Sequence, residues 1–415
     1  MVLVVDRTSL DMSRANEGPK AVAGSIDARE VTSLSQELIR IPSTFGNEKR
    51  LAEFIFRRLE KWGLSPRFVP VKGFGPDVVC EVGPPGTKCI VFNGHIDTVE
   101  VMAGWKHDPF SADIDNGLLF GLGSLDMKCG IAGMMLAFRA IAEFRSNLKN
   151  RFMFQAVTGE EDSGLGTWTL VKEGAFKRAV AAIVGEGFGG LRAVTVGRRG
   201  ASYYDIYVHG RAAHGATPGK GISAIADASS IVHAFDGMPM RKGRNMVGED
   251  FRPLVESQTV LKVHGGSGSL SVPEECYVYA VSHTLPGTKN VRERQIRKVV
   301  RDLRLRSRVD IKLKTGIDLY HPYSTPAKSL LVQSAVDSIR QETRRSPKLV
   351  YGLSEADDNI IAHEVGIPVI CFGPGESGTL ARYHQPEEAV SVAQLGPAAK
   401  AYALTALSLS DRLVR

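Results

Sequence analysis

The sequence has few of the features that mark special classes of protein. Its five cysteines in 415 residues include no Cys-x-x-Cys pair, which excludes a disulfide framework and makes the reducing cytoplasm the expected compartment. The longest apolar runs, such as residues 89–92 and 179–184, fall far short of the roughly 20 residues that a membrane span requires. Charged residues directly follow the apolar residues 1–5, so we also expect no secretion signal.

What the chain does contain is an ordinary globular composition with one basic segment. Hydrophobic residues make up 43% and charged residues 23%, and the length suits two domains. Residues 289–314 contain eleven Lys and Arg against three acidic residues, whereas the whole chain has a net charge of +7. Because these charges lie along a predicted amphipathic helix at 290–303, they favour a solvated face over a surface for nucleic acid. We expect neither a membrane nor a nucleic-acid partner.

Strand-like and helical segments alternate along most of the chain, which is typical of an α/β fold. Short apolar runs predict buried strands, and apolar residues at helical spacing predict helices that cover the sheet. The strands are expected at 89–92, 152–157, 179–184 and 367–372, and the helices at 51–62, 131–141, 329–342 and 359–365. We therefore predict a mostly parallel, helix-covered sheet.

A second pattern interrupts this alternation. Between residues 201 and 314 the order is strand, helix, strand, strand, helix, strand, which is the βαββαβ plait of small α/β domains. We expect residues 1–28 to form an N-terminal arm or tail. Residues 29–194 and 315–415 should form one α/β domain from both ends of the chain, with residues 195–314 inserted as the plait.

Side chains that can bind metal ions follow the predicted strands. In chain order they are His95 and Asp97, then Glu160 and Glu161, then Glu186, and finally His384 after a glycine loop; Asp126 lies just before the helix at 131–141. Because ligands bind beyond the carboxyl ends of the strands in open α/β sheets, these side chains should converge.

A single histidine or carboxylate at a strand end is more often a cap or a hydrogen-bonded structural residue than a metal ligand. Several at successive strand ends favour a metal site, and imidazole and oxygen ligands without thiolate suit zinc, manganese or cobalt. Asp97 is near enough to His95 to fix its tautomer. Because Glu160 and Glu161 are adjacent, one can bind metal while the other stays free as a base.

These residues stand in stretches that resemble a known family, the dizinc amidohydrolases that include acetylornithine deacetylase, succinyl-diaminopimelate desuccinylase, aminoacylase and glutamate carboxypeptidase. The stretches occur in the family's order. They are NGHIDTV at 93–99, GLGSLDMKCG at 121–130, TGEEDSG at 158–164, GE at 185–186, GRAAHGATP at 210–218 and FGPG at 372–375, followed by His384 and Glu388.

The resemblance implies a zinc-peptidase-like catalytic domain that binds two divalent metal ions, zinc in the first place and cobalt or manganese as alternatives. His95, Asp126 and Glu186 would hold one ion. Asp126, Glu161 and His384 would hold the other, so that Asp126 bridges the two.

The resemblance also implies roles for residues that do not bind metal. Glu160 would be the general base and Asp97 would orient His95. The inserted plait would be a lid or dimerisation domain, and its His214 would reach the active site of the partner subunit in a homodimer.

The expected reaction is hydrolysis of the C–N bond of a small N-acyl amino acid or a short peptide, as in an N-acyl-amino-acid deacylase or a dipeptidase-like carboxypeptidase. A catalytically silent binding or scaffold homologue stays open, although the complete ligand set and Glu160 argue against it. An aminopeptidase on the same scaffold also stays open, although the plait with His214 argues against it.

Two positions in the plait depart from the family pattern. Leu270 stands where relatives usually have Asn, and His283 stands where they have Arg; the resemblance implies that both help to bind a substrate carboxylate. An unperturbed histidine is mostly neutral at pH 7, so we expect weaker binding of a free carboxylate unless another cation such as Arg199 or Arg382 replaces the missing one.

Overall fold

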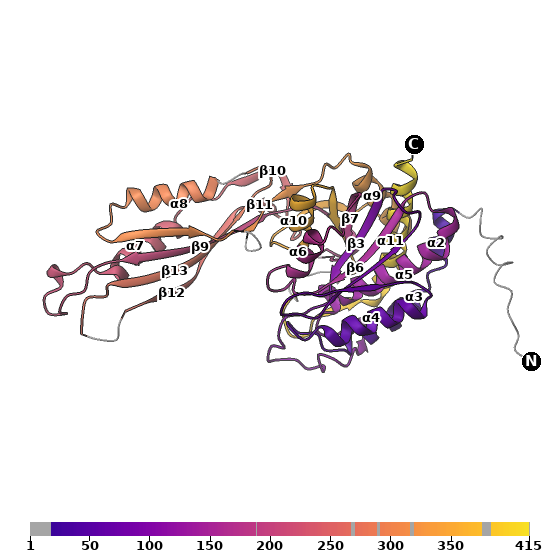
Figure 1. Cartoon of the computed structure of the whole chain (residues 1–415), viewed down its shortest axis with the longest axis horizontal. Coiled ribbons are helices and arrows are strands. Elements are labelled where there is room, and N and C mark those ends of the chain that lie inside the picture. Colours follow the sequence, from indigo (N-terminus) through magenta and orange to yellow (C-terminus); the bar gives the residue numbers. More distant parts are fainter. Residues whose placement is uncertain are drawn as a thin grey trace, which may run out of the picture. The chain divides into compact units, whose positions relative to one another are not determined.

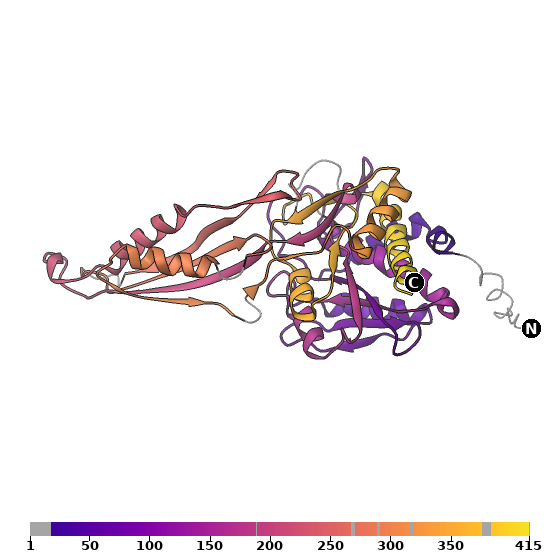
Figure 2. The ribbon, with the colours of Figure 1, turned by 90° about the horizontal axis from the view of Figure 1, so that it is seen from above.

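The computed structural model describes residues 18–187, 189–266, 270–288, 291–315, 319–375 and 383–414. Its contacts divide the chain into two compact units. The first unit comprises the chain up to Val196 together with Thr325–Val350 and Ala356–Arg415, and the second comprises Gly197–Ser324 and Tyr351–Glu355. The helices and strands of both are labelled in Figure 1 and seen from above in Figure 2.

A twisted sheet forms the core of the first unit (Figure 1). Its strands follow the order β1-β2-β6-β3-β7-β18-β8, and β17 also pairs with β8. The bounds are Arg67–Val69 for β1, Asp77–Val82 for β2, Cys89–His95 for β3, Arg151–Val157 for β6, Ala179–Val184 for β7, Ala193–Arg198 for β8, Lys348–Gly352 for β17 and Val369–Cys371 for β18.

The predicted α/β class is confirmed, and the parallel pairing occupies the centre of the sheet. Strands β6, β3, β7 and β18 are parallel neighbours, whereas β1, β2 and β8 pair antiparallel at the two sides. The central strands are almost wholly buried apolar runs, as strands covered on both faces must be. The carboxyl ends of these four strands therefore meet at one edge of the sheet.

Helices pack around this sheet and define the rest of the first unit. Helix α4 begins at Lys49 and ends at Lys61, close to the predicted 51–62, and Gly63 with a φ of +76° follows its end. Helix α2 contacts α11, so residues 19–24 lie on the body of the unit. The other helices are α2 Pro19–Gly24, α3 Ala28–Ile39, α5 Cys129–Glu143, α6 Leu165–Lys172, α9 Leu330–Thr343, α10 Asp357–Ile360 and α11 Val392–Arg412.

A small sheet of β19 (Ala389–Ser391), β5 (Leu118–Phe120) and β4 (Ile114–Asp115) completes the first unit. Residues 1–17 of the expected arm lie outside the described residues. Among the described helices, none combines the length and the apolar character that a bilayer crossing requires. All five cysteines are free and buried.

The second unit has the predicted βαββαβ order. The elements are β9 Gly200–His209, α7 Ala224–Asp236, β12 Ser257–Gly265, β13 Glu275–Thr284, α8 Val291–Asp302 and β14 Arg308–Leu313, and the sheet order is β12-β13-β9-β14 with antiparallel pairing. A hairpin of β10 (Lys242–Val247) and β11 (Pro253–Val255) is an addition that the sequence analysis missed.

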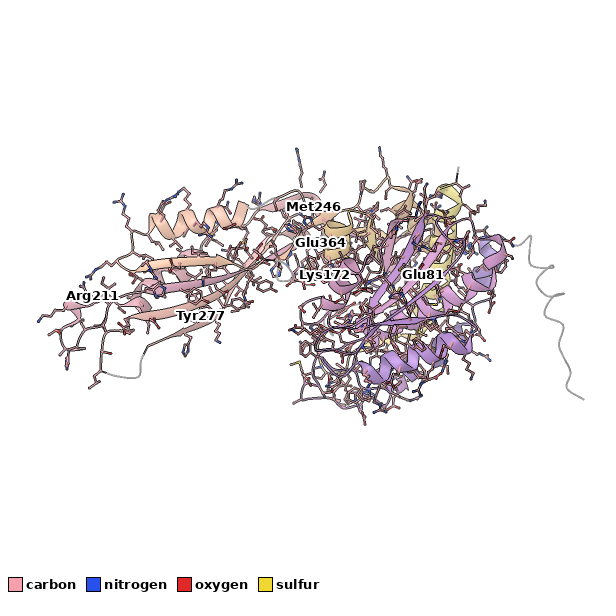
Figure 3. All side chains as sticks on the ribbon, viewed as in Figure 1. Glu81, Lys172, Arg211, Met246, Tyr277 and Glu364 are labelled. Atoms are coloured by element: carbon pink, nitrogen blue, oxygen red, sulfur yellow. The ribbon has the colours of Figure 1, made fainter. Side chains whose placement is uncertain are left out.

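One face of this sheet packs under its two helices. Ile206 and Val278 of the strands form a core with Ile231 and Phe235 of α7 and Ile296 of α8. Because side chains alternate along a strand, Tyr277 points to the other face. There its ring lies 5.3 Å from that of Tyr207 and its hydroxyl donates to Asp205 (Figure 3).

The second unit extends beyond the inserted segment 195–314 that the sequence suggests. Strand β15 (Leu319–Tyr320) pairs with β9, and β16 (Tyr323–Ser324) pairs with Arg198 and Gly197 at the end of β8. These strands are only two residues long, and such short segments carry no periodicity from which a boundary can be predicted.

Candidate metal centre

The predicted ligands of the first unit come from the carboxyl ends of its parallel strands. His95 is the last residue of β3, Glu160 and Glu161 follow β6, and Glu186 follows β7. Asp126 lies in the turn before α5. His384 lies just before β19 and adopts a left-handed φ of +55°, which is uncommon for a residue with a side chain and indicates a backbone held by its surroundings.

Asp126 lies between the two histidines. Its Oδ1 is 2.9 Å from Nε2 of His95, and its Oδ2 is 3.3 Å from Nε2 of His384. Nε2 of His384 is also 2.9 Å from Oε2 of Glu161. The ligand atoms of His95, Asp126 and Glu161 all lie within 4.8 Å of one another. One carboxylate that faces two imidazoles through its two oxygens has the arrangement that a bridging ligand needs.

His95 presents a defined tautomer to this cluster. Its Nδ1 lies 3.0 Å from the backbone carbonyl of Asp97 and 3.6 Å from that residue's carboxylate. Because a carbonyl oxygen can only accept, Nδ1 carries a proton, and Nε2, which faces Asp126, is the nitrogen that can bind a metal ion.

The carboxylate of Asp97 has a second contact that the sequence did not suggest. Its Oδ2 accepts the backbone N–H of Glu161 at 2.9 Å. Asp97 therefore joins the loop after β3 to the loop after β6, and it fixes the backbone from which Glu161 reaches toward His384.

The two adjacent glutamates differ in their surroundings. Glu161 contacts His384, whereas the carboxylate of Glu160 has no hydrogen-bond partner among the described residues. Burial raises the pKa of both, and for Glu160 the nearby charges of Glu161 and Glu186 add to the effect. A half-buried carboxyl with an elevated pKa and no partner is suited to accept and return a proton.

The histidines respond to the same excess of carboxylates. Burial alone would lower the pKa of His95, but its bonds to Asp126 and Asp97 raise it. The contacts with Asp126 and Glu161 raise the pKa of His384 to about 11. So many acidic groups in one buried place favour binding of positive charge, as protons or as metal ions.

The structure does not bring all predicted residues into one tight cluster. Glu186 is buried near Glu160, but it stands outside the group of three closest ligands. His214 belongs to the second unit, where it is exposed and its Nδ1 accepts the N–H of Ala216.

Glu388 is a residue whose role the sequence analysis missed. It is buried, and its carboxylate accepts the N–H groups of Gly123 at 3.0 Å, Leu125 at 2.7 Å and Asp126 at 3.0 Å. Burial raises its pKa to about 8. It follows His384 by four residues, so one side chain connects the loop of His384 to the turn of Asp126. The sequence analysis names Glu388 only as part of the last stretch that resembles the family and gives it no role.

His283, one of the two positions that depart from the family pattern, belongs to a hydrogen-bonded polar group of the second unit. Nε2 of His283 lies 3.0 Å from Oε2 of Glu355, and its Nδ1 lies 3.1 Å from the hydroxyl of Ser257. Burial would raise the pKa of Glu355, but the bonds from His283 and Tyr203 lower it to about 2. Leu270 is exposed.

Arg199 lies next to this group but does not offer a free guanidinium. Its Nε donates to the carbonyl of Leu353, and its Nη1 donates to the carbonyl of Val255 and the hydroxyl of Ser257. Its charge is directed toward the unit's own backbone rather than toward solvent. In this arrangement Arg199 does not replace the missing arginine, and the other candidate, Arg382, lies outside the described residues.

Comparison with known proteins gives a family and several full-length relatives. Residues 91–408 match the family model described as Peptidase family M20/M25/M40. A succinyl-diaminopimelate desuccinylase of Hydrogenovibrio crunogenus is 27% identical over 391 residues, which cover 92% of this chain and 99% of the relative.

Solved structures share the fold over nearly the whole chain. The aminopeptidase PepT of Bacillus cereus matches with a TM-score of 0.73 and 20% identity, over 92% of this chain and 99% of its own. The YXEP protein of Bacillus subtilis, described as a dinuclear metal-binding peptidase of the M20 family, matches with a TM-score of 0.67 and 15% identity, over 92% of this chain and 97% of its own. A protein described as an aminopeptidase thus shares the fold along its full length, so the presence of the plait by itself does not separate a deacylase from an aminopeptidase.

Proposed function

Because the chain belongs to the peptidase family M20/M25/M40 and is thereby a metal-dependent hydrolase of amide bonds, we propose that the cluster around Asp126 is its catalytic centre. The substrate class we propose is an N-acyl amino acid or a short peptide. The observation that supports this most directly is the position of Asp126, whose two oxygens face His95 and His384.

The donor set fits two divalent metal ions. His95, Asp126 and Glu186 would hold one, and Asp126, Glu161 and His384 would hold the other. Imidazole and carboxylate ligands without thiolate suit zinc, and they also accept cobalt or manganese. Bound there, the ions would supply Lewis acidity, which polarises an amide carbonyl and makes water a stronger acid at neutral pH.

The chain's own residues would handle the protons. Glu160 takes a proton from the attacking water as the C–O bond forms, and it returns that proton to the amine nitrogen as the C–N bond breaks. The products are a carboxylic acid and an amine, and Glu160 ends as it began. Asp97 holds the backbone of Glu161 throughout, so the base and the adjacent ligand keep their separate orientations.

We further propose a homodimer that forms through the second unit. Its edge strand β12 exposes Leu261 and Val263, whereas the opposite edge β14 carries Arg308, Asp310 and Lys312. Charged residues protect a sheet edge from pairing and apolar residues do not, so β12 is the edge suited to a second copy. His214 would then act in the partner's active site. The buried, free cysteines agree with a cytoplasmic enzyme.

The test is a substrate screen with purified protein that has been stripped of metal and reloaded with zinc, cobalt or manganese. We expect release of an amine from N-acyl amino acids or from di- and tripeptides only after reloading. Peptides with a blocked amino terminus separate an aminopeptidase from a deacylase or carboxypeptidase. A chain that binds two ions but hydrolyses none of these substrates would favour the silent scaffold instead.

A further inference from the structure

Large apolar side chains lie exposed on the segments of the first unit that border the proposed metal centre. Phe45, Val101 and Met102 are each between 41% and 49% exposed, and Phe74 is half-buried beside Phe45. We call these four residues the apolar rim. Apolar side chains gathered at the surface next to a catalytic residue mark a place where something apolar binds.

The two phenylalanines form a fixed pair next to Glu160. Their ring centres are 5.0 Å apart and the rings are nearly perpendicular, at 87°, which is a favourable edge-to-face geometry. The ring of Phe74 lies against Gly159, since a Cβ placed on that glycine would come within 2.9 Å of the ring. Gly159 directly precedes Glu160, so the aromatic surface adjoins the proposed base.

A buried carboxylate holds this pair in place. One oxygen of Glu48 accepts the N–H of Gly46 at 2.6 Å and the other accepts the N–H of Gly75 at 2.8 Å. These glycines directly follow Phe45 and Phe74, so Glu48 joins the turns that carry the two rings. A surface whose shape is fixed before binding loses less entropy when a ligand arrives.

Val101 and Met102 extend the rim along the loop that follows Asp97. That loop is fastened at its start, because Thr98 accepts the N–H of Phe45 at 3.1 Å. It is fastened at its end by Glu387, which accepts the N–H groups of Lys106 and His107 from the segment that carries His384. The exposed side chains therefore lie on a loop held between the Phe45 turn and a metal-ligand loop.

We propose that the apolar rim binds a large apolar group, aromatic or a long aliphatic chain, on one side of the amide bond that is cleaved. This rests on the proposed function and specifies its substrate class. It separates this chain from its desuccinylase relative, since a succinyl group ends in a charged carboxylate that gains nothing from contact with phenylalanine rings. The rim selects substrates by apolar area.

The experiment measures kcat/KM of the metal-loaded protein for two matched series. One series keeps the amino acid and varies the acyl group through acetyl, succinyl, hexanoyl and benzoyl, and the other keeps the acyl group and varies the amino acid through Ala, Leu and Phe. We expect at least about a tenfold preference for the larger apolar group in one of the series, which corresponds to about 1.4 kcal/mol. The series that shows it identifies the side of the amide bond.

Variants tie this preference to the rim. Phe45→Ala and Phe74→Ala should each lower kcat/KM for the apolar substrate about tenfold more than for the acetyl compound, and Phe45→Leu should retain much of the preference. Phe68→Ala is the control, because Phe68 is similarly exposed but stacks on Phe56 at the sheet edge. When either phenylalanine substitution is added to Glu160→Gln protein, binding of the apolar substrate, measured by calorimetry, should weaken in parallel with the loss in kcat/KM.

The outcomes separate two kinds of failure. If no N-acyl amino acid or peptide is hydrolysed by metal-loaded protein, the proposed function fails. If hydrolysis occurs but acetyl or succinyl substrates are preferred, the inference about the rim is wrong. Equal losses for all substrates in the phenylalanine variants would also overturn it, because the rim would then be covered by protein rather than by substrate.

Discussion

Two carboxylates in each unit are held in opposite ways. In the first unit, burial raises the pKa values of Glu160 and Glu388, and the partners of Glu388 among the described residues are backbone N–H groups. In the second unit, Glu256 pairs with Arg241 and Arg292, and Glu355 pairs with His283. Burial would raise the pKa of Glu256 and Glu355, but these partners lower both.

The difference shows which of these carboxylates have their charge balanced by a basic residue of the chain itself. Glu256 and Glu355 each have a basic partner within the second unit, so their charges are balanced without a ligand. The cluster around Asp126 in the first unit gathers more carboxylates than His95 and His384 can balance, and such an excess is stable only with added protons or cations. Such a cluster is suited to bind cations that the chain itself does not supply.

The largest effect should come from Glu160. We expect Glu160→Gln to reduce kcat by about 10²- to 10⁴-fold, because proton transfer is lost while the shape is kept. Metal content after dialysis should not change, whereas Glu161→Ala should lose bound metal. Near-normal turnover of Glu160→Gln at saturating metal would show that another group is the base.

A second test asks whether the exposed His214 serves the other subunit. Glu160→Gln and His214→Ala should each be inactive alone. After subunit exchange in a 1:1 mixture, half of the dimers would be hybrids with one intact site, so about a quarter of the wild-type activity should return. Absence of recovery in dimers shown to be mixed, for example by mass spectrometry of differently tagged chains, would count against action in trans.

Glu388 offers a third test, with its neighbour as the control. Glu388→Gln replaces one acceptor oxygen by an NH2 group, which can only donate, so the turn of Asp126 loses part of its support. We expect metal affinity to fall about tenfold, as for other residues that orient ligands. Glu387→Gln should change it less than about twofold, since Glu387 contacts residues 106 and 107 and not the turn of Asp126. Titration with cobalt, followed by absorbance, measures both.

The smallest effect concerns pH and distinguishes the two units directly. The folded pKa of Glu355 is about 2, below its ordinary value, so its contribution to stability is present above about pH 4.5 and is lost as the pH falls toward 2. This amounts to about 3 kcal/mol or less. In Glu355→Gln protein the loss between pH 4.5 and pH 2 should be smaller.

The metal-free first unit should behave in the opposite way. The folded pKa of Glu388 is raised to about 8 and that of His384 to about 11. The stability that Glu388 contributes is therefore lost as the pH rises from about 4.5 to about 8, and the stability that His384 contributes is lost as the pH rises from about 6.5 to about 11. Hydrogen exchange resolved by segment would separate the units, and added zinc should reverse the trend in the first unit alone. A common pH response of both units would contradict the comparison.

Much of this arrangement could be predicted from the sequence. Apolar runs and helical spacing placed the central strands, helix α4 and the βαββαβ order, because buried segments carry strong periodicity. The strand-end rule indicated that His95, Glu161 and His384 should approach one another. The short strands β15 and β16 and the β10–β11 hairpin could not be predicted, since they are too short or too irregular to show a period in the sequence.

The sequence by itself determined the chemical types at the centre, two imidazoles among several carboxylates with no thiolate, and the order of elements that supplies them. The tertiary structure alone decided how those groups are held. Three contacts between distant segments show this. Asp97 accepts the backbone N–H of Glu161, Glu388 joins two ligand loops, and Arg199 donates to backbone carbonyls. Local sequence cannot encode them, because a hydrogen bond forms only when the fold brings a donor and an acceptor within range. Burial then removes water as an alternative partner for both groups.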